Sequence, residues 1–245
     1  MRHAATAATR ANAFPVDEPL DERGLAAAAL LAAAFPPRCE ALCSPALRCR
    51  QTAEAAGLPA PSVQPALAEC DFGAWAGRSL ADVHAAEPES ATAWMLDPDA
   101  RPHGGESLTA FAARVGAWLD GQARRDGCAV AITHGGVVKA ALVHALDAPL
   151  HAFWQIDSRP LSITELHGWA GGHWTVTRVN WVADAPRHAG TVRHPGACAA
   201  DGAQSSRGPA MIPAPSPPPS NGAQSSRGPA MIPAPSPPPS NGAQS

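Results

Sequence analysis

The chain has 245 residues, of which 45% are apolar and 16% charged, a composition that is ordinary for a soluble globular protein. Its 18 basic and 21 acidic residues are spread along the chain and give a net charge of −3 at pH 7, which argues against nucleic acid or an anionic membrane as a partner. The longest apolar run, residues 25–35, is about half of the roughly 20 residues that span a bilayer.

The predicted elements alternate between short apolar strands and longer helices. In chain order they are a helix at 23–35, a strand at 39–43, a helix at 47–56, a weaker strand at 63–67, helical turns at 80–86 and 91–96, a helix at 107–125, a strand at 128–133, a helix at 136–146, and a hairpin of strands at 161–166 and 173–179. Pro36-Pro37 and Gly57 end the first two helices, and Ser107 is a favourable N-cap for the longest one. Repeated strand-helix units indicate an α/β fold with a largely parallel sheet.

The C-terminal segment has a different character from the rest. Residues 202–221 recur letter for letter at 222–241, and both copies are rich in Pro, Ser, Gly and Ala. We therefore expect a folded domain at 1–182 and a disordered tail at 183–245. The PSPPPS stretch is either a ligand for a proline-recognising domain or part of a duplication without structural consequence.

The sequence lacks two patterns that bear on the cellular location of the protein and on the redox state of its cysteines. No basic and then apolar leader opens the sequence, so we expect a cytoplasmic protein. The cysteines show neither CxxC pairs nor the Cys/His spacing of a zinc site, so we expect them to be reduced and mostly buried. They are Cys39, Cys43, Cys49, Cys70, Cys128 and Cys198.

Two strand-to-helix corners carry basic or imidazole side chains. Arg48 follows the strand at 39–43, and His134 follows the strand at 128–133. In open α/β sheets, ligands bind outside the carboxyl ends of the strands, where helix N-termini present free N–H groups to an anion. Arg2-His3 would be a third such corner if a strand preceded it. The corners therefore point to one anion-binding crevice.

These residues also carry a family resemblance. Five motifs occur in order along the chain: Arg2-His3, SPALRCRQTA at 44–53, ECDFGAW at 69–75, GGES at 104–107 and THGG at 133–136. Together they resemble the histidine phosphatase superfamily, which has the phosphoglycerate mutase-like fold. The resemblance covers residues 1 to about 182 and implies a three-layer α/β/α sandwich with a largely parallel central sheet. In that fold a strand precedes the Arg-His pair, and we expect this N-terminal strand to be missing here.

The resemblance implies a phosphohistidine mechanism. His3 would attack phosphorus, Arg2, Arg48 and His134 would hold the phosphoryl oxygens, and Glu69 would protonate the leaving oxygen before water hydrolyses the phosphohistidine. Guanidinium groups around a nucleophile suit phosphoryl transfer, which asks chiefly for positioning and charge neutralisation. Thr9 would donate one bond to phosphate where relatives often have Asn, and Ser107 would assist. No metal or other cofactor is expected.

Departures from the family pattern bear on the substrate. Ala4, Ala5 and Ala76 replace residues that are usual in the family. ECDFGAWAGR and DPDARPHGGES are similar to the alpha-ribazole phosphatases, so we expect hydrolysis of a small phosphorylated metabolite, alpha-ribazole 5′-phosphate among the candidates. A phosphoglycerate mutase-type phosphotransferase and a non-catalytic phosphate-binding or adaptor protein are the alternatives. The oligomeric state is left open.

Overall fold

A short parallel sheet forms the centre of the structure. The structure, a computed structural model, describes residues 1–182 except 33, 37, 59 and 170–171, so the tail predicted at 183–245 and Cys198 lie outside the described residues. The strands β1 (Glu40–Cys43), β2 (Ser62–Val63) and β3 (Ala129–Ile132) pair in the order β2-β1-β3. All pairs are parallel, which confirms the α/β fold predicted from the sequence.

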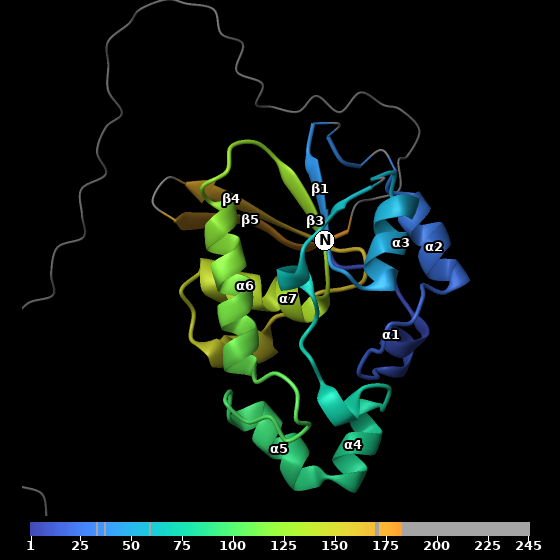
Figure 1. Cartoon of the computed structure of the whole chain (residues 1–245), viewed down its shortest axis with the longest axis vertical. Coiled ribbons are helices and arrows are strands. Elements are labelled where there is room, and N and C mark those ends of the chain that lie inside the picture. Colours follow the sequence, from blue (N-terminus) through green and yellow to red (C-terminus); the bar gives the residue numbers. More distant parts are fainter. Residues whose placement is uncertain (33, 37, 59, 170–171, 183–245) are drawn as a thin grey trace, which may run out of the picture. The chain divides into compact units, whose positions relative to one another are not determined.

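Helices cover both faces of this sheet (Figure 1). The helices α2 (Glu22–Ala29) and α3 (Leu47–Ala55) lie on one side, and α6 (Leu108–Gln122) and α7 (Gly135–Ala145) lie on the other. Successive side chains of a strand point to opposite faces. Leu42 of β1 accordingly packs with Phe111 and Val115 of α6, whereas the next residue, Cys43, packs with Ala28 of α2 and Ala53 of α3. The result is the expected three-layer α/β/α sandwich.

The first residues of the chain lie beside β3. The Thr133 N–H donates to the Met1 carbonyl at 2.9 Å, and the His3 N–H donates to the Thr133 carbonyl at 2.8 Å. On the other side, the Arg2 N–H donates to the Ser162 carbonyl at 3.0 Å. These backbone bonds fix the position of His3.

The polar excursion at residues 69–106 carries its own small core. It contains η2 (Gly73–Trp75), α4 (Leu80–Ala86) and α5 (Pro88–Leu96). Phe14, Trp75, Val83 and Ala91 form this core, and Trp94 packs against it. The helix α5 begins three residues before the turn predicted at 91–96, because Pro88 is favoured in the first turn of a helix.

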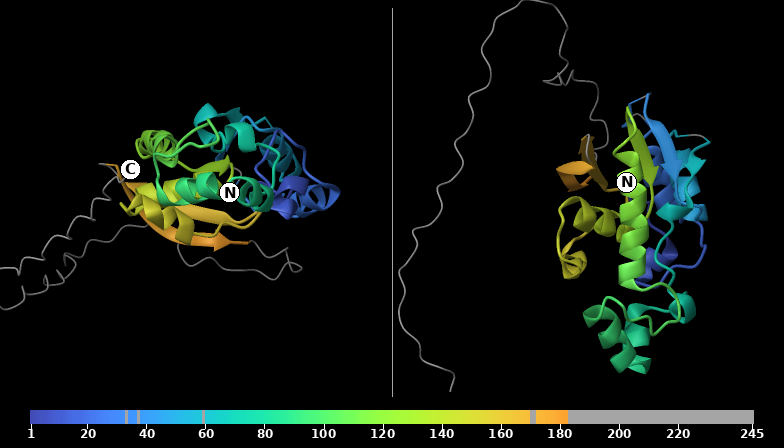
Figure 2. Two further views of the ribbon diagram at one scale, coloured as in Figure 1. Left: turned by 90° about the horizontal axis from the view of Figure 1, so that it is seen from below. Right: turned by 60° about the vertical axis from the view of Figure 1, so that its left-hand side comes forward.

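A terminal hairpin completes the fold, as predicted. The strands β4 (Ile163–Trp169) and β5 (His173–Trp181) pair antiparallel, and β5 contacts α7. Both strands lie beside the α7 layer in Figure 2. A short 3₁₀ element, η3 (Leu150–Gln155), connects α7 to the segment that enters the hairpin.

Besides α5, three elements differ from the sequence-based prediction. The helix predicted at 23–35 ends at Ala29, because the Leu31 and Ala32 N–H groups bond three residues back, to Ala28 and Ala29, and tighten the chain into turns. The strand predicted at 63–67 is limited to β2 and followed by η1 (Pro65–Leu67), since Pro65 has no N–H for a ladder. The helix α1 (Ala7–Ala11) was not predicted.

No helix of the described residues is long and apolar enough to cross a membrane.

The prediction that all six cysteines are reduced is wrong for two of them. Cys39 and Cys128 form a disulfide, whereas Cys43, Cys49 and Cys70 are free. The parallel register pairs Glu40 with Ala129, so the residues that precede β1 and β3 lie side by side, with their Cα atoms 4.5 Å apart. Their separation of 89 residues in the sequence gives no sign of this contact.

Candidate active site

His3 lies at the edge of the sheet and is nearly buried, with 5% of its surface exposed. Its Nδ1 is 2.6 Å from the Ala4 carbonyl oxygen, which can only accept, so Nδ1 carries the proton and Nε2 is the free nitrogen. The Ala4 N–H donates to Thr52 Oγ1 at 3.0 Å, and that hydroxyl donates to the Arg48 carbonyl at 2.7 Å. These bonds tie the His3 corner to α3.

His134 and Arg48 meet at the carboxyl ends of β3 and β1. Because these strands are neighbours in the sheet, the corners after them lie together. Arg48 Nη2 donates to His134 Nδ1 at 3.1 Å, so the proton of His134 is on Nε2, which donates to Ser44 Oγ at 2.8 Å. The rings of His134 and His3 lie edge to face with centroids 5.2 Å apart. The structure thus joins the two corners predicted from the sequence.

Both histidines are held neutral. Burial, followed by the charge of Arg48, lowers the pKa of His3 from 6.5 to about 3. Burial and Arg48 also lower the pKa of His134 well below 6.5. A neutral His3 has an Nε2 lone pair available at neutral pH, which is the state that a nucleophile needs.

Glu69 follows η1 and faces the N-terminus of α7. Its Oε1 accepts a hydrogen bond from the Cys70 N–H at 3.1 Å, and its Oε2 accepts one from the Gly136 N–H at 3.2 Å. Burial nevertheless raises the pKa of Glu69 above 4.5, because the desolvation of the carboxylate outweighs these bonds and the attraction of Arg48. A carboxyl group with a raised pKa is suited to donate a proton.

Arg114 of α6 holds the backbone that leads to Glu69. Its Nη1 donates to the carbonyls of Ala66 and Ala68 at 2.7 and 3.0 Å. The same guanidinium forms an ion pair with Glu106, with 2.8 Å between Nη2 and Oε2. Glu106 of the GGES motif is therefore a structural partner of Arg114 and does not line the cavities described below.

A cavity of about 270 Å³, termed the cationic cavity, is lined by three of the residues predicted to bind phosphate, Arg2, Thr9 and Arg48. His134 does not line it, so its contact with the phosphoryl oxygens stays a prediction. Arg2, His3, Thr9, Arg48 and Glu69 are among the residues that line it. The described residues contain no cluster of three or more His, Cys, Asp or Glu side chains with the arrangement of a metal site. The positive charge of the cavity comes from its two guanidinium groups, which suit a phosphoryl dianion.

A carboxylate in this cavity was not predicted. Glu18 Oε2 lies 3.7 Å from Arg48 Nη1, and Glu18 Oε1 accepts a hydrogen bond from Thr6 Oγ1 at 3.0 Å. A phosphoryl group that enters the cavity competes with Glu18 for Arg48.

Two of the predicted binding residues have local partners. Thr9 lines the cationic cavity, and its hydroxyl is 3.1 Å from Thr6 Oγ1. Ser107 caps α6 by accepting a hydrogen bond from the Ala110 N–H at 3.2 Å, and it lines neither this cavity nor the aromatic one described next. The substrate contact expected for Ser107 stays a prediction.

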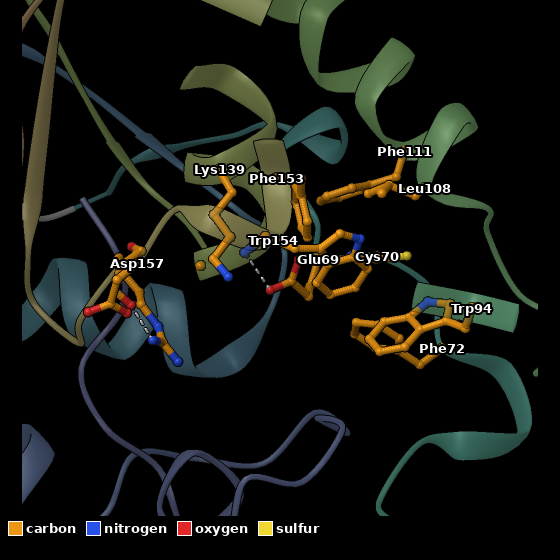
Figure 3. Close-up of a pocket in the computed structure, with 14 residues that line it drawn as sticks. Glu69, Cys70, Phe72, Trp94, Leu108, Phe111, Lys139, Phe153, Trp154 and Asp157 are labelled. Carbon is orange, nitrogen blue, oxygen red and sulfur yellow. Dashed lines mark hydrogen bonds between the residues drawn. The ribbon is translucent and has the colours of Figure 1, made fainter. Parts of the chain in front are cut away.

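A second cavity opens on the other side of Glu69 and is termed the aromatic cavity. It has a volume of about 250 Å³ and shares Arg2, Glu69, Phe72 and Trp94 with the cationic cavity. Its remaining lining consists of Cys70, Leu108, Phe111, Gly135, Gly136, Lys139, Phe153, Trp154, Asp157 and Ser158. Figure 3 shows aromatic side chains on one side of Glu69, with Lys139 and Asp157 on the other. Glu69 thus stands where the two cavities meet.

Several residues of the site were missed by sequence reasoning. Ser44 and Thr52 lie inside the second motif, but nothing in the motif shows that one binds His134 and the other links Ala4 to α3. Gly136 was noted only as a helix opening, although a Cβ there would lie 2.2 Å from Glu69 Oε1. The second glycine of the THGG motif is the sequence feature that could have indicated this close contact.

Comparison with solved structures shows the same fold in several phosphatases. The alpha-ribazole phosphatase from Shigella flexneri is 22% identical with a TM-score of 0.65, over 75% of this chain and 96% of that chain. The mycobacterial glucosyl-3-phosphoglycerate phosphatase Rv2419c is 25% identical with a TM-score of 0.63, over 73% and 95%. A protein from Thermus thermophilus, TTHB049, is 37% identical with a TM-score of 0.52, over 60% and 83%.

The sequence comparisons agree with this fold. Bifunctional protein Rv2228c from Mycobacterium tuberculosis is 32% identical over 118 residues, which make up 46% of this chain and 32% of that protein. The chain therefore spans about a third of the length of the curated relatives that it matches. The profile of the histidine phosphatase superfamily (branch 1) matches residues 1–182. With this match and the sandwich fold, the chain belongs to the histidine phosphatase superfamily (branch 1).

Proposed function

We propose that the protein is a phosphatase that hydrolyses a small phosphomonoester through a phosphohistidine at His3. The observation that carries the proposal is the state of the His3 imidazole. Its Nδ1 proton is donated to the Ala4 carbonyl, its pKa is lowered to about 3, and it lines a cavity with Arg2 and Arg48. A neutral, oriented imidazole beside two guanidinium groups is suited to attack a phosphoryl group.

The proposed reaction has two steps. In the first, His3 Nε2 forms a bond to phosphorus, the bond between phosphorus and the ester oxygen breaks, and Glu69 donates its proton to that oxygen. In the second, water attacks phosphorus, the Glu69 carboxylate accepts a proton from the water, and the bond from Nε2 to phosphorus breaks. Glu69 suits both steps because it lies where the cationic and aromatic cavities meet.

The remaining side chains position and neutralise the phosphoryl group. Arg2 and Arg48 would bind its oxygens from the cationic cavity, where Thr9 would donate one more hydrogen bond. His134 lies behind them, and its bonds with Arg48 and Ser44 would hold the Arg48 guanidinium in place. Removal of one such donor to a charged transition state typically costs about 10²–10³ in kcat.

For the substrate we propose alpha-ribazole 5′-phosphate or a related metabolite. The segments ECDFGAWAGR and DPDARPHGGES support this proposal through their similarity to the alpha-ribazole phosphatases. Rv2419c, which is similar in fold, is described as a glucosyl-3-phosphoglycerate phosphatase, so members with this fold differ in their leaving groups.

Hydrolysis of p-nitrophenyl phosphate by the full chain, with and without a chelator, tests the proposal. We expect activity that survives the chelator, is lost in His3→Ala, and is kept in the exposed control His84→Ala. A phosphodonor should label the protein with an acid-labile, base-stable phosphate that His3→Ala lacks.

The same experiments distinguish the alternatives. A mutase-type transferase would require a bisphosphate primer and transfer phosphate faster than it hydrolyses the ester. An adaptor would show neither hydrolysis nor labelling. Either result overturns the proposal of a phosphatase.

A further inference from the structure

The aromatic cavity combines aromatic side chains with two carboxyl groups, Glu69 and Asp157, and two cations, Arg2 and Lys139. Phe111 and Phe153 are buried in its floor, with 0% and 7% of their surfaces exposed. Trp154 keeps 37% of its surface exposed at the cavity. The Trp94 ring meets the Trp154 ring nearly edge to face, with centroids 4.8 Å apart. A cluster of aromatic side chains that lines a cavity marks a binding site for an apolar or aromatic group.

The rings come from separate parts of the chain and meet only in the folded protein. Phe72 lies in the ECDFGAW motif, Trp94 lies on α5, and Phe153 and Trp154 lie on η3. Phe153 and Trp154 are 5.1 Å apart between centroids, and Phe72 and Trp94 are 6.2 Å apart. Spacings and tilts of this size are those of interacting aromatic pairs, so the wall is preformed.

The position of the cavity relates it to the leaving group. It shares Glu69 and Arg2 with the cationic cavity that holds His3. An ester whose phosphoryl group lies in the cationic cavity, and whose leaving oxygen faces Glu69, extends its leaving group into the aromatic cavity. The volume of about 250 Å³ is just below the range of about 300–1,000 Å³ for drug-sized ligands, so it suits one ring system.

Polar groups occupy the opposite edge of the aromatic cavity. The Ser158 hydroxyl is buried, since the residue is 2% exposed, and it has no hydrogen-bond partner among the described residues. Lys139 Nζ lies 5.3 Å from the Phe153 ring centroid, and no ion pair is formed by Lys139 within the described part of the chain. Unpaired polar groups beside an apolar wall are typical of a ligand site that orients its ligand.

We propose that the aromatic cavity is a subsite for a planar aromatic ring on the leaving group, with Trp94 and Trp154 as its specificity-determining residues. The inference rests on the proposed function, because it takes the cationic cavity as the phosphoryl site. It extends that function by naming the chemical class of the substrate, a phosphomonoester of an alcohol that carries an aryl or heteroaryl ring.

Phenethyl phosphate and cyclohexylethyl phosphate test the subsite. Both esters release a primary alcohol of similar acidity and size, so they differ in the aromatic character of the ring. We expect kcat/KM to be about three- to tenfold higher for the phenethyl ester, the size of an aromatic-aromatic interaction. Trp94→Leu and Trp154→Leu should each reduce this preference toward one. Trp169→Leu, which removes a 60% exposed indole on β4, should leave it unchanged.

Calorimetric binding of the matching phosphonates separates failure of the subsite from failure of the proposed function, because phosphonates bind without being hydrolysed. Equal kcat/KM for both esters together with equal phosphonate affinities would overturn the subsite and leave the phosphatase proposal intact. Tighter binding of the phenethyl phosphonate without hydrolysis dependent on His3 would overturn the phosphatase proposal and support the subsite. A preference that persists in both tryptophan variants would also overturn the subsite.

Discussion

The second glycine of the THGG motif offers a sharp test of the role of Glu69. A Cβ at Gly136 would lie 2.2 Å from Glu69 Oε1 and 3.2 Å from Phe111 Cζ. A Cβ at the neighbouring Gly135 would lie 3.4 Å from Arg2 Nε, which is an ordinary contact. Gly136→Ala must therefore displace the Glu69 carboxyl by about 1.2 Å to restore a contact of 3.4 Å, whereas Gly135→Ala displaces nothing.

The two variants are matched in the residue introduced and in their position in the helix. Both glycines lie in the first turn of α7, so alanine improves helix propensity at each by at most about 1 kcal/mol. A misplacement of about 1 Å in a catalytic group costs about 10²-fold in rate. We expect Gly136→Ala to lose about that factor in kcat on an alkyl phosphate and Gly135→Ala to keep its kcat.

The choice of substrate makes this test specific to proton donation. An alkoxide needs a proton to leave, whereas p-nitrophenolate leaves without one, so Gly136→Ala should lose much less activity on p-nitrophenyl phosphate than on phenethyl phosphate. Equal losses on both substrates, or an equal loss in Gly135→Ala, would refute the assignment of Glu69 as the proton donor. Thermal unfolding of both variants checks that the fold is kept.

Three further changes probe the charge, the disulfide and the buried hydrogen bonds. Glu69→Gln should lose about 10²–10⁴ in kcat. Its free energy of unfolding should match that of the parent near pH 4 and exceed it as the pH rises. The reason is that the folded-state pKa of Glu69 is raised, so above that range the buried, ionised carboxylate of the parent costs stability. Denaturant titrations at several pH values measure this difference. Cys39→Ser should lower the free energy of unfolding by about 2–4 kcal/mol, and dithiothreitol should lower that of the parent but not of the variant. Thr52→Val should cost about 1–3 kcal/mol in the same assay, since it leaves the Ala4 N–H unpaired, whereas the exposed Thr92→Val should cost about 0.5 kcal/mol or less.

Each of these expectations has a contrary result. A Glu69→Gln variant that is less stable than the parent at high pH would show that the carboxylate is stabilised by its backbone donors. An unchanged unfolding curve of the parent in dithiothreitol would argue against a contribution of the disulfide. Equal costs for the two threonine variants would remove the role of Thr52 as a link between the His3 corner and α3.

The local elements and their type were predictable from the sequence. The helix that Ser107 caps and the hairpin near the end of the domain occur as predicted, because capping residues and periodic apolar patterns act within a few neighbours. Parallel pairing followed from the alternation of strands and helices. The boundary errors, such as the early end of α2, arose where the apolar run continues but the backbone tightens into turns, which the side-chain pattern does not show.

The corners that bear Arg48 and His134 could be placed at the carboxyl ends of strands from the sequence, and the ordered motifs pointed to Glu69 as their partner. Only the tertiary structure decided how these groups interact, because their protonation depends on burial and on charges that lie far away in the chain. The lowered pKa of His3, the raised pKa of Glu69 and the link from Gly136 to Glu69 all arise from such contacts. The disulfide between Cys39 and Cys128 and the aromatic cavity were likewise decided only by the tertiary structure. Strand register and helix packing bring their residues together, and the local sequence around each residue does not show which distant residue it will contact.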